Sequence, residues 1–236
     1  MEPIVRCVEL DPAKVPADLR YPFNIPAISG MGRLEFNAGV TVFMGENGSG
    51  KSTLIEAIAI KAGFNPEGGS KHFTTRLRPS ESDLVDALRL TRGTRREKSG
   101  FFLRAETMFN VATEAEQYRE YGWADLHEMS HGEAFFWLAQ NRFRAGGLYM
   151  LDEPEAALSP QRQLALLVRM HELVTGGSQV LMSTHSPILM AYPGATIYLL
   201  NDAGIRRIAY EDTEHYTITL SFLRDRDRML RMLFEE

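Results

Sequence analysis

Gly45-Glu46-Asn47-Gly48-Ser49-Gly50-Lys51-Ser52-Thr53 is the stretch that decides the fold, because it fits the pattern G-x-x-x-x-G-K-[ST]. An apolar, β-branched run at 40–44 precedes it and predicts a buried strand. Apolar residues at helical spacing follow it, and Gly63 ends that run. A strand, a glycine-rich turn and a helix N-terminus together direct backbone N–H groups at one point. The stretch therefore predicts a binding site for a polyphosphate.

Two side chains near the end of this stretch have roles in such a site. Lys51 would reach the β- and γ-phosphates of a nucleotide, and Ser52 would ligate Mg²⁺. The glycines let the backbone approach the anion without a Cβ in the way. We therefore expect a nucleotide and Mg²⁺ as ligands.

The composition is that of a globular protein. The chain has 236 residues, 44% apolar and 24% charged, and we predict a single domain over 1–236. No apolar run approaches the roughly 20 residues of a membrane span, so direct membrane insertion is not expected. The first residues lack the pattern of a signal peptide, and Cys7 is the only cysteine. These features favour a cytoplasmic protein, and the net charge of -5 does not indicate nucleic-acid binding.

Residues 71–104 are locally basic, with nine Lys/Arg against four Asp/Glu. Strands are predicted at 88–91 and 100–104, around a polar turn. Such a basic hairpin is either a solvated surface element, which the sparse aromatic content favours, or a contact for nucleic acid or an acidic partner. An aromatic side chain in the proline-rich stretch at 21–26 would stack on a nucleotide base or pack on the first strands.

Other patterns predict the remaining elements. A helix is expected at 106–121, and another begins at the N-cap Ser159 and ends near 174. Strands at 196–200 and 205–210 predict a β-hairpin, and the residues from 213 onward predict a charged helix.

A pair of acids, Asp152-Glu153, follows the apolar run at 147–151. Ligands of an open α/β sheet bind outside the carboxyl ends of its strands, so the two acids would lie at the ligand edge. There Asp152 would hold Mg²⁺ through water, and Glu153 would activate the attacking water as a general base. Alone, the pair reads as two solvated acids, but the upstream phosphate-binding turn favours the functional interpretation.

Three further positions are candidates. His185 follows the predicted strand at 179–183, where its imidazole would reach the γ-phosphate and orient the water. The stretch Ser130-His131-Gly132-Glu133 opens a predicted helix as an S-x-x-E capping box, and the same helix N-terminus would bind an anion. Glu106 follows the predicted strand at 100–104. It is either an acid favoured at a helix N-terminus or a ligand of metal or water.

These motifs together resemble those of the ABC-type ATPases. The family's Walker A, signature, Walker B, D-loop and H-loop are similar, in this order, to Gly45–Thr53, Ser130–Glu133, Asp152–Pro154, Ala157–Ser159 and Ser183–His185. The first stretch and Asp-Glu-Pro-Glu-Ala-Ala-Leu-Ser at 152–159 resemble the AAA_21/AAA_23 group of small predicted ATPases, related to SMC-, RecF- and OLD-type ATPase heads. The resemblance implies an α/β P-loop NTPase fold: an ABC-ATPase-like mixed sheet with flanking helices and a short helical subdomain at about 106–143.

The resemblance also implies how the site is completed. Two copies of the chain would sandwich two ATP molecules, with Ser130 and Gly132 of one copy contacting the γ-phosphate held by the other. Glu106 stands at the Q-loop position, which is a glutamine in the family. The signature reads Met-Ser-His-Gly-Glu rather than Leu-Ser-Gly-Gly-Gln.

We predict an ATPase with ATP and Mg²⁺ as cofactors, which dimerises around ATP and drives a conformational change in a protein partner. Two alternatives stay open: the ATP-binding subunit of an ABC transporter, and an ATP-gated nucleic-acid-binding module of a DNA repair or phage-defence system. Between Glu106 and Ser130 there is room for about one helix and a loop, and no heptad repeat occurs there. The chain therefore looks like a stand-alone ATPase head.

Overall fold

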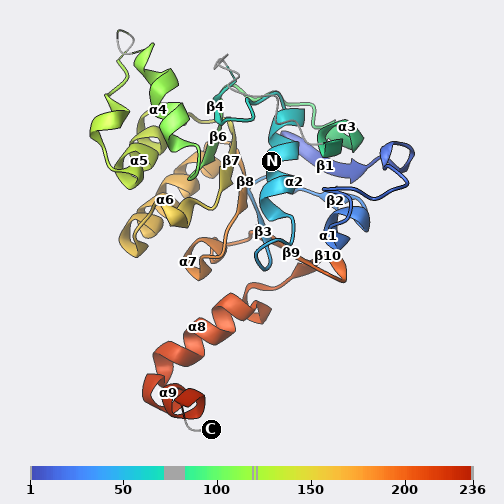
Figure 1. The fold of residues 1–236 in the computed structure, drawn as a ribbon. Helices are drawn as coiled ribbons and strands as arrows, with labels where there is room; N and C mark the ends of the chain where they lie inside the picture. Colours follow the sequence, from blue (N-terminus) through green and yellow to red (C-terminus); the bar gives the residue numbers. More distant parts are fainter. Residues whose placement is uncertain (1, 72–82, 119, 121, 235–236) are drawn as a thin grey trace.

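The structure is a computed structural model that describes residues 2–71, 83–118, 120 and 122–234. Within these residues the strands form two sheets (Figure 1). The larger sheet contains, in order from one edge, β10 (Gly204–Ile208), β9 (Thr196–Asn201), β3 (Val40–Met44), β8 (Gln179–Ser183), β7 (Leu148–Asp152), β6 (Gly100–Arg104) and β4 (Gly69–Ser70). The smaller sheet contains β2 (Leu34–Glu35), β1 (Val5–Leu10) and β5 (Leu88–Arg92).

The larger sheet is mixed. Its strands from β9 to β6 are parallel neighbours, whereas β10 and β4 pair antiparallel at the two edges. The carboxyl ends of the parallel strands therefore share one edge, where ligands of such sheets bind. The predicted α/β class and mixed sheet are confirmed, and so is the hairpin of β9 and β10.

Helices flank the sheet on both faces. The helices of the described residues are α1 (Pro26–Ser29), α2 (Lys51–Lys61), α3 (Asp83–Ala87), α4 (Met108–Glu116), α5 (His131–Asn141), α6 (Pro160–Thr175), α7 (Pro187–Met190), α8 (Glu214–Arg224) and α9 (Arg226–Phe234), of which α8 and α9 do not cover the sheet. Short 3-10 turns are η1 (Pro12–Lys14), η3 (Leu126–Glu128), η4 (Pro154–Ala156) and η5 (Tyr210–Asp212). The helix predicted at 106–121 is shorter in the structure. α4, η3 and α5 fall within the range predicted for a helical subdomain, and the division into domains stays a prediction.

Successive residues of the central strands face two different cores. Val42 of β3 and Met182 of β8 lie in one core, and their neighbours Phe43 and Leu181 lie in the other. The first core takes in α4, α5 and α6, and the second takes in α2 and α3. Because both faces are covered, β3, β7 and β8 are buried along their whole length, as the apolar runs at 40–44 and 147–151 predict for β3 and β7.

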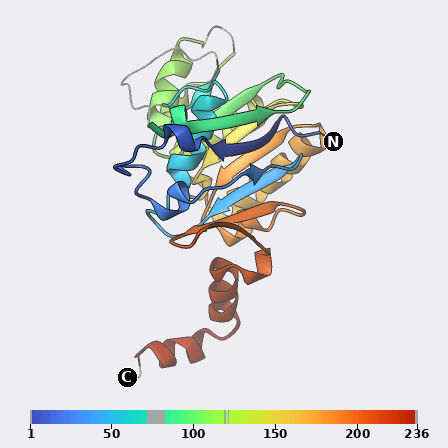
Figure 2. The ribbon, with the colours of Figure 1, turned by 90° about the vertical axis from the view of Figure 1, so that its right-hand side faces the viewer.

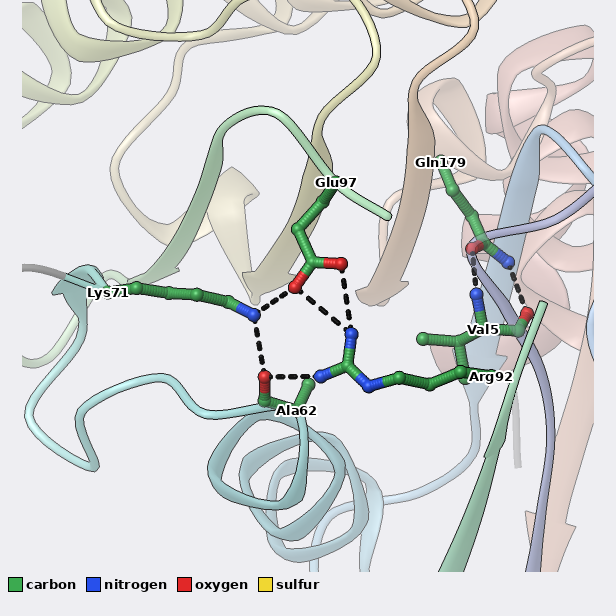
Figure 3. Close-up of polar contacts among 6 residues, drawn as sticks. All are labelled: Val5, Ala62, Lys71, Arg92, Glu97 and Gln179. Carbon is green, nitrogen blue, oxygen red and sulfur yellow. Dashed lines mark hydrogen bonds and ion pairs between the residues drawn. The ribbon is translucent and has the colours of Figure 1, made fainter. Parts of the chain in front are cut away.

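The prediction of a basic hairpin at 88–104 is wrong. β5 pairs antiparallel with β1 in the smaller sheet, whereas β6 pairs with β7 and β4 in the larger one. The connecting segment crosses between the sheets and is held by a polar cluster (Figure 3). In this cluster the Arg92 guanidinium donates to the Glu97 carboxylate at 2.9 and 3.0 Å and to the Ala62 carbonyl at 2.7 Å. Lys71 donates to the same carboxylate and, at 2.7 Å, to the same carbonyl.

Several of the basic residues at 71–104 thus make hydrogen bonds within the fold. Arg95 donates to the carbonyl oxygens of Glu2 and Gly177 at 3.3 and 3.0 Å. Arg76 and Arg78 lie outside the described residues. Since Arg92 and Lys71 are also engaged, this segment offers fewer free cations than its sequence indicates.

A second polar contact joins the two sheets. The Gln179 side chain, which is buried, accepts from the Val5 N–H at 2.8 Å and donates to the Val5 carbonyl at 2.9 Å (Figure 3). It also donates to the Asn37 carbonyl at 3.2 Å. The smaller sheet is therefore attached to β8 by specific hydrogen bonds as well as by apolar packing.

The charged C-terminal segment forms two helices rather than one. Asp225 ends α8 with φ -146° and ψ 67°, a non-helical conformation, and α9 starts at the next residue. Both helices extend away from the sheets (Figures 1 and 2). Of the described helices, none has the length and apolar character that crossing a membrane requires.

Candidate functional site

Four segments with predicted site residues lie at the edge of the larger sheet that is formed by the carboxyl ends of its parallel strands. The P-loop (Gly45–Thr53) follows β3, and Glu153 follows β7. His185 lies two residues after β8, and Glu106 two residues after β6. β3, β8, β7 and β6 are consecutive neighbours in the sheet, so the sequence motifs converge because of the strand order.

The P-loop is built from close backbone approaches. A Cβ on Gly45 would lie 2.2 Å from the Leu200 carbonyl oxygen, so a side chain cannot be accommodated there. The turn closes with a hydrogen bond from the Ser49 N–H to the Glu46 carbonyl at 3.2 Å. α2 then begins at Lys51, and its positive end faces the turn.

Lys51 is a buried cation at the centre of this turn. It is 4% exposed, and its Nζ donates to the Glu46 carbonyl at 3.0 Å. Burial lowers the pKa of Lys51, and the negative charges of Glu153 and Asp152 oppose that shift. The neighbouring Ser49 Oγ is buried and has no hydrogen-bond partner among the described residues. A buried ammonium group and an unsatisfied hydroxyl suit an anionic ligand.

Asp152 lies in a row of polar side chains across three strands. The parallel register places it beside Arg104 of β6 and Ser183 of β8. The Ser183 hydroxyl donates to Asp152 Oδ1, and Arg104 Nε lies 3.3 Å from Asp152 Oδ2. The carboxylate is thus oriented by a hydroxyl on one side and a guanidinium on the other.

Glu153 adopts a left-handed backbone conformation with φ 47° and ψ 52°. This region is sparsely populated by residues other than glycine and is often found at functional sites. The Glu153 N–H donates to the Ser183 carbonyl at 3.1 Å and to the Ser183 Oγ at 3.2 Å. Burial raises the pKa of the Glu153 carboxyl, and the Asp152 charge raises it further. A carboxylate with a raised pKa is a better proton acceptor.

The structure brings His185 to Glu153. Its Nε2 lies 3.7 Å from Glu153 Oε1. The loop that carries it is fixed by Glu155, which accepts from the His185 N–H at 2.6 Å and from the Thr184 hydroxyl at 2.7 Å. Burial lowers the pKa of His185, and Lys51 and His215 lower it further, so the ring is neutral near pH 7.

Glu106 is highly exposed, with 83% of its side chain accessible. Its Oε2 lies 3.6 Å from Arg104 Nη2, and Arg104 Nη1 also binds Glu56 at 2.8 Å. Arg104 thus joins Glu56, Glu106 and Asp152. Among the described residues, no group of three or more His, Cys, Asp or Glu gathers closely enough to hold a metal ion.

The signature stretch forms the predicted capping box at the start of α5. The Ser130 N–H and hydroxyl donate to Glu133 Oε2 at 3.0 and 2.7 Å, and the Glu133 N–H donates to the Ser130 Oγ at 3.3 Å. A Cβ on Gly132 would lie 2.3 Å from the Ala157 carbonyl oxygen. The helix start is therefore pressed against the predicted D-loop, and only glycine fits there.

The aromatic residues at 21–26 divide between the two interpretations. Phe23 is fully buried in the second core. Tyr21 is 63% exposed, and its hydroxyl lies 3.1 Å from the Thr53 hydroxyl at the end of the P-loop. Phe23 therefore packs in the core, and the stacking of an aromatic ring such as Tyr21 on a base stays a prediction.

Three residues around this site, Arg104, Glu155 and His215, were missed as functional candidates, and Ser183 was noted only as the first residue of the stretch that resembles the H-loop. Ser183 and Arg104 are polar residues that end apolar strands, and this signal identifies them only when the strand order is known. Glu155 is one of three consecutive acidic or proline positions after β7. No local pattern marks His215, which reaches the site from α8.

Comparison with known proteins gives matches to AAA-type family models and to solved ABC-type structures. The AAA_23 family model, described as "AAA domain", matches residues 27–96, which include the P-loop. The AAA_21 model, described as "AAA domain, putative AbiEii toxin, Type IV TA system", matches residues 113–191, which include the other motifs. The solved structure of cbiO1 from Clostridium perfringens, part of the ABC transporter complex cbiONQ, has a TM-score of 0.50 at 16% identity and covers 100% of both chains.

Two AAA-type family models thus match separate parts of the chain, and its fold is similar to that of cbiO1. The SMC head domain from Thermotoga maritima matches the chain with a TM-score of 0.48 at 14% identity, covering 89% of the chain and 100% of the SMC head. No curated protein matches the chain in sequence.

Proposed function

We propose that the chain binds ATP with Mg²⁺ and hydrolyses it, and that two copies close around the nucleotide during turnover. The observation that carries the proposal is the meeting of Glu153 and His185 next to the buried Lys51. Glu153 has a raised pKa and a constrained backbone, and His185 Nε2 lies 3.7 Å from its carboxylate. A base, an orienting imidazole and a phosphate-binding cation are the parts that hydrolysis of a phosphoanhydride requires.

Each of these residues has its own task. The P-loop amides and the Lys51 ammonium bind the β- and γ-phosphates. Glu153 takes the proton of the attacking water, and His185 orients that water or the γ-phosphate. Ser183 keeps Asp152 and the Glu153 backbone in place, because its hydroxyl bonds to both.

The donor set beside the P-loop fits Mg²⁺, which prefers hydroxyl, carboxylate and phosphate oxygens. The Ser52 hydroxyl and the Asp152 carboxylate would hold the ion, together with phosphate oxygens of the nucleotide. The ion would neutralise charge on the β- and γ-phosphates. Glu106 is a further candidate ligand, and its exposed side chain is accessible to an ion.

The dimer is supported by where the signature stretch lies. α5 and α2 pack in different cores, on opposite faces of the larger sheet. The start of α5 is thus remote from the P-loop helix of the same chain, as Figure 1 also shows. Ser130 and Gly132 would therefore contact a γ-phosphate held by a second copy.

The alternative of an ATP-gated nucleic-acid-binding module is less well supported. Arg92 and Arg95, which would contact the nucleic acid, make hydrogen bonds within the fold. No observation favours the transporter subunit over a stand-alone ATPase. A cytoplasmic location and a protein partner stay predictions.

Replacing Glu153 tests the proposal. We expect Glu153→Gln to bind ATP normally and to hydrolyse it at least about 100-fold more slowly, since the general base is lost. ATP should then trap the dimer, which light scattering coupled to gel filtration measures. Glu211→Gln, which changes an exposed acid on η5, is the matched control and should behave as wild type. A Glu153→Gln chain that hydrolyses ATP at the wild-type rate and stays monomeric would refute the assignment.

A further inference from the structure

The ring of His185 makes a hydrogen bond that the proposed chemistry does not use. Its Nδ1 lies 3.1 Å from Nε2 of His215, in the first turn of α8. The two rings are inclined by 48° with their centroids 5.2 Å apart. The other nitrogens, His185 Nε2 and His215 Nδ1, are buried and have no hydrogen-bond partner among the described residues.

The donor and the acceptor of the hydrogen bond between His185 and His215 can be assigned. One nitrogen of the pair must donate, and a neutral imidazole carries a single N–H. His185 Nε2 faces the Glu153 carboxylate at 3.7 Å, so a bare lone pair there would be repelled by negative charge. The proton of neutral His185 therefore belongs on Nε2, which leaves Nδ1 as an acceptor. His215 Nε2–H must then be the donor.

We propose that His215 is a positioning residue that holds His185 in the tautomer whose Nε2–H points toward Glu153 and the γ-phosphate. This inference rests on the proposed hydrolysis. An Nε2–H can donate to a phosphate oxygen or to the attacking water, whereas a bare Nε2 would repel the phosphate. His215 acts through His185 and does not itself reach the reacting atoms.

The surroundings of the pair are consistent with this role. Lys51, Glu46 and Glu153 face His185. On the other side, His215 lines a cavity of about 250 Å³ that is also lined by the first P-loop residues, Gly45 and Glu46. The charged residues Arg206, Asp212 and Glu214 line the same cavity.

The position of His215 in the fold adds a consequence. α8 packs on η5 and α7, and otherwise α8 and α9 project from the body (Figures 1 and 2). His215 therefore attaches this projecting arm to the hydrolytic site. Displacing α8 would remove the donor from His185 without altering the P-loop.

Two variants of equal length separate the hydrogen bond from packing. His215→Gln keeps an N–H donor, and His215→Met fills similar space without one. We expect His215→Met to lower kcat for ATP about tenfold, with KM within about twofold of wild type, and His215→Gln to recover most of the rate. His171→Gln, on α6, is the control and should be unchanged. Equal rates for Met, Gln and wild type, or equal losses for Met and Gln, would overturn the proposal.

Nitrogen-15 NMR of the full-length, histidine-labelled chain tests the tautomer without relying on activity. We expect wild-type His185 to be protonated at Nε2 and not at Nδ1, and His215→Met to show a mixture of both tautomers. A proton on Nδ1 of wild-type His185 would overturn the inference even if the protein hydrolyses ATP. If the wild type has no ATPase activity, the proposed function fails, while the NMR spectrum still decides the His215 contact.

Discussion

At the scale of single residues, Lys51 is a buried cation with little internal pairing. Burying an ammonium group is costly unless it is paired, and the Nζ of Lys51 donates only to a carbonyl in the hydrogen bonds of the described residues. Asp152, Glu153 and Glu155 supply negative charge around it without a direct ion pair among the described residues. This environment supports the proposal that Lys51 binds a phosphate group in place of the Glu46 carbonyl.

Replacing this residue should abolish binding. We expect Lys51→Ala to show no ATP binding in titration calorimetry, because the cation at the centre of the P-loop is lost. Lys98→Ala, which removes an exposed lysine remote from the P-loop motif, should bind as wild type does. Wild-type affinity in the Lys51→Ala chain would contradict the P-loop assignment.

At the scale of elements, the polar cluster around the Glu97 carboxylate connects β5, β4 and α2. Glu97 accepts from Arg92 at the end of β5 and from Lys71 just after β4, and both cations also donate to the carbonyl of Ala62, the residue that follows α2 (Figure 3). Burial by itself would raise the pKa of Glu97. The hydrogen bonds from Lys71 and Arg92 and the charge of Lys71 outweigh that effect and lower the pKa.

Glu97→Gln should therefore destabilise the fold. We expect the free energy of unfolding at pH 7 to fall by about 1–3 kcal/mol, since charge-assisted bonds are lost from a largely buried site. The lowered pKa means that wild type holds this stabilisation above pH 4.5, the ordinary value, and loses it as the pH falls through the folded pKa. Urea denaturation at several pH values measures the effect, and the difference between the chains should shrink below pH 4.5.

Glu211→Gln is the control for this experiment and should stay within about 0.5 kcal/mol of wild type. A difference between Glu97→Gln and wild type that grows toward low pH would contradict the assigned direction of the pKa shift.

At the scale of the whole molecule, the two parts of the proposed site lie on opposite faces of one sheet. The P-loop helix α2 belongs to the second core and the signature helix α5 to the first. Gly132 packs so closely on the Ala157 carbonyl that α5 and the segment after β7 should move together. A second copy is the means by which both parts meet at one nucleotide.

Mixing two inactive chains tests this arrangement. Ser130→Arg should bind ATP as a monomer and fail to turn it over, because a bulky cation blocks the signature. Lys51→Ala should be inactive for lack of binding. In a symmetric pair, a mixed dimer of the two would keep one intact composite site, so the mixture should recover up to about a quarter of the wild-type rate. Normal turnover by Ser130→Arg alone would mean that this stretch is only a helix cap.

The secondary structure near the site could be read from local patterns. The strands predicted at 40–44 and 179–183 are β3 and β8, and the capping box at Ser130 is present with the predicted bonds. The hairpin predicted at 88–104 was wrong because strand propensity does not say which sheet a strand joins. The single C-terminal helix was wrong because Asp225 interrupts it.

The amino-acid sequence by itself determined the phosphate-binding turn, the acids after β7 and the histidine after β8, since each is specified by residues a few positions apart. Only the tertiary structure decided what surrounds them. Strand order and register place Arg104 and Ser183 beside Asp152, and the path of α8 brings His215 to His185 across 30 residues. Such contacts depend on packing between distant segments, and no local pattern encodes them.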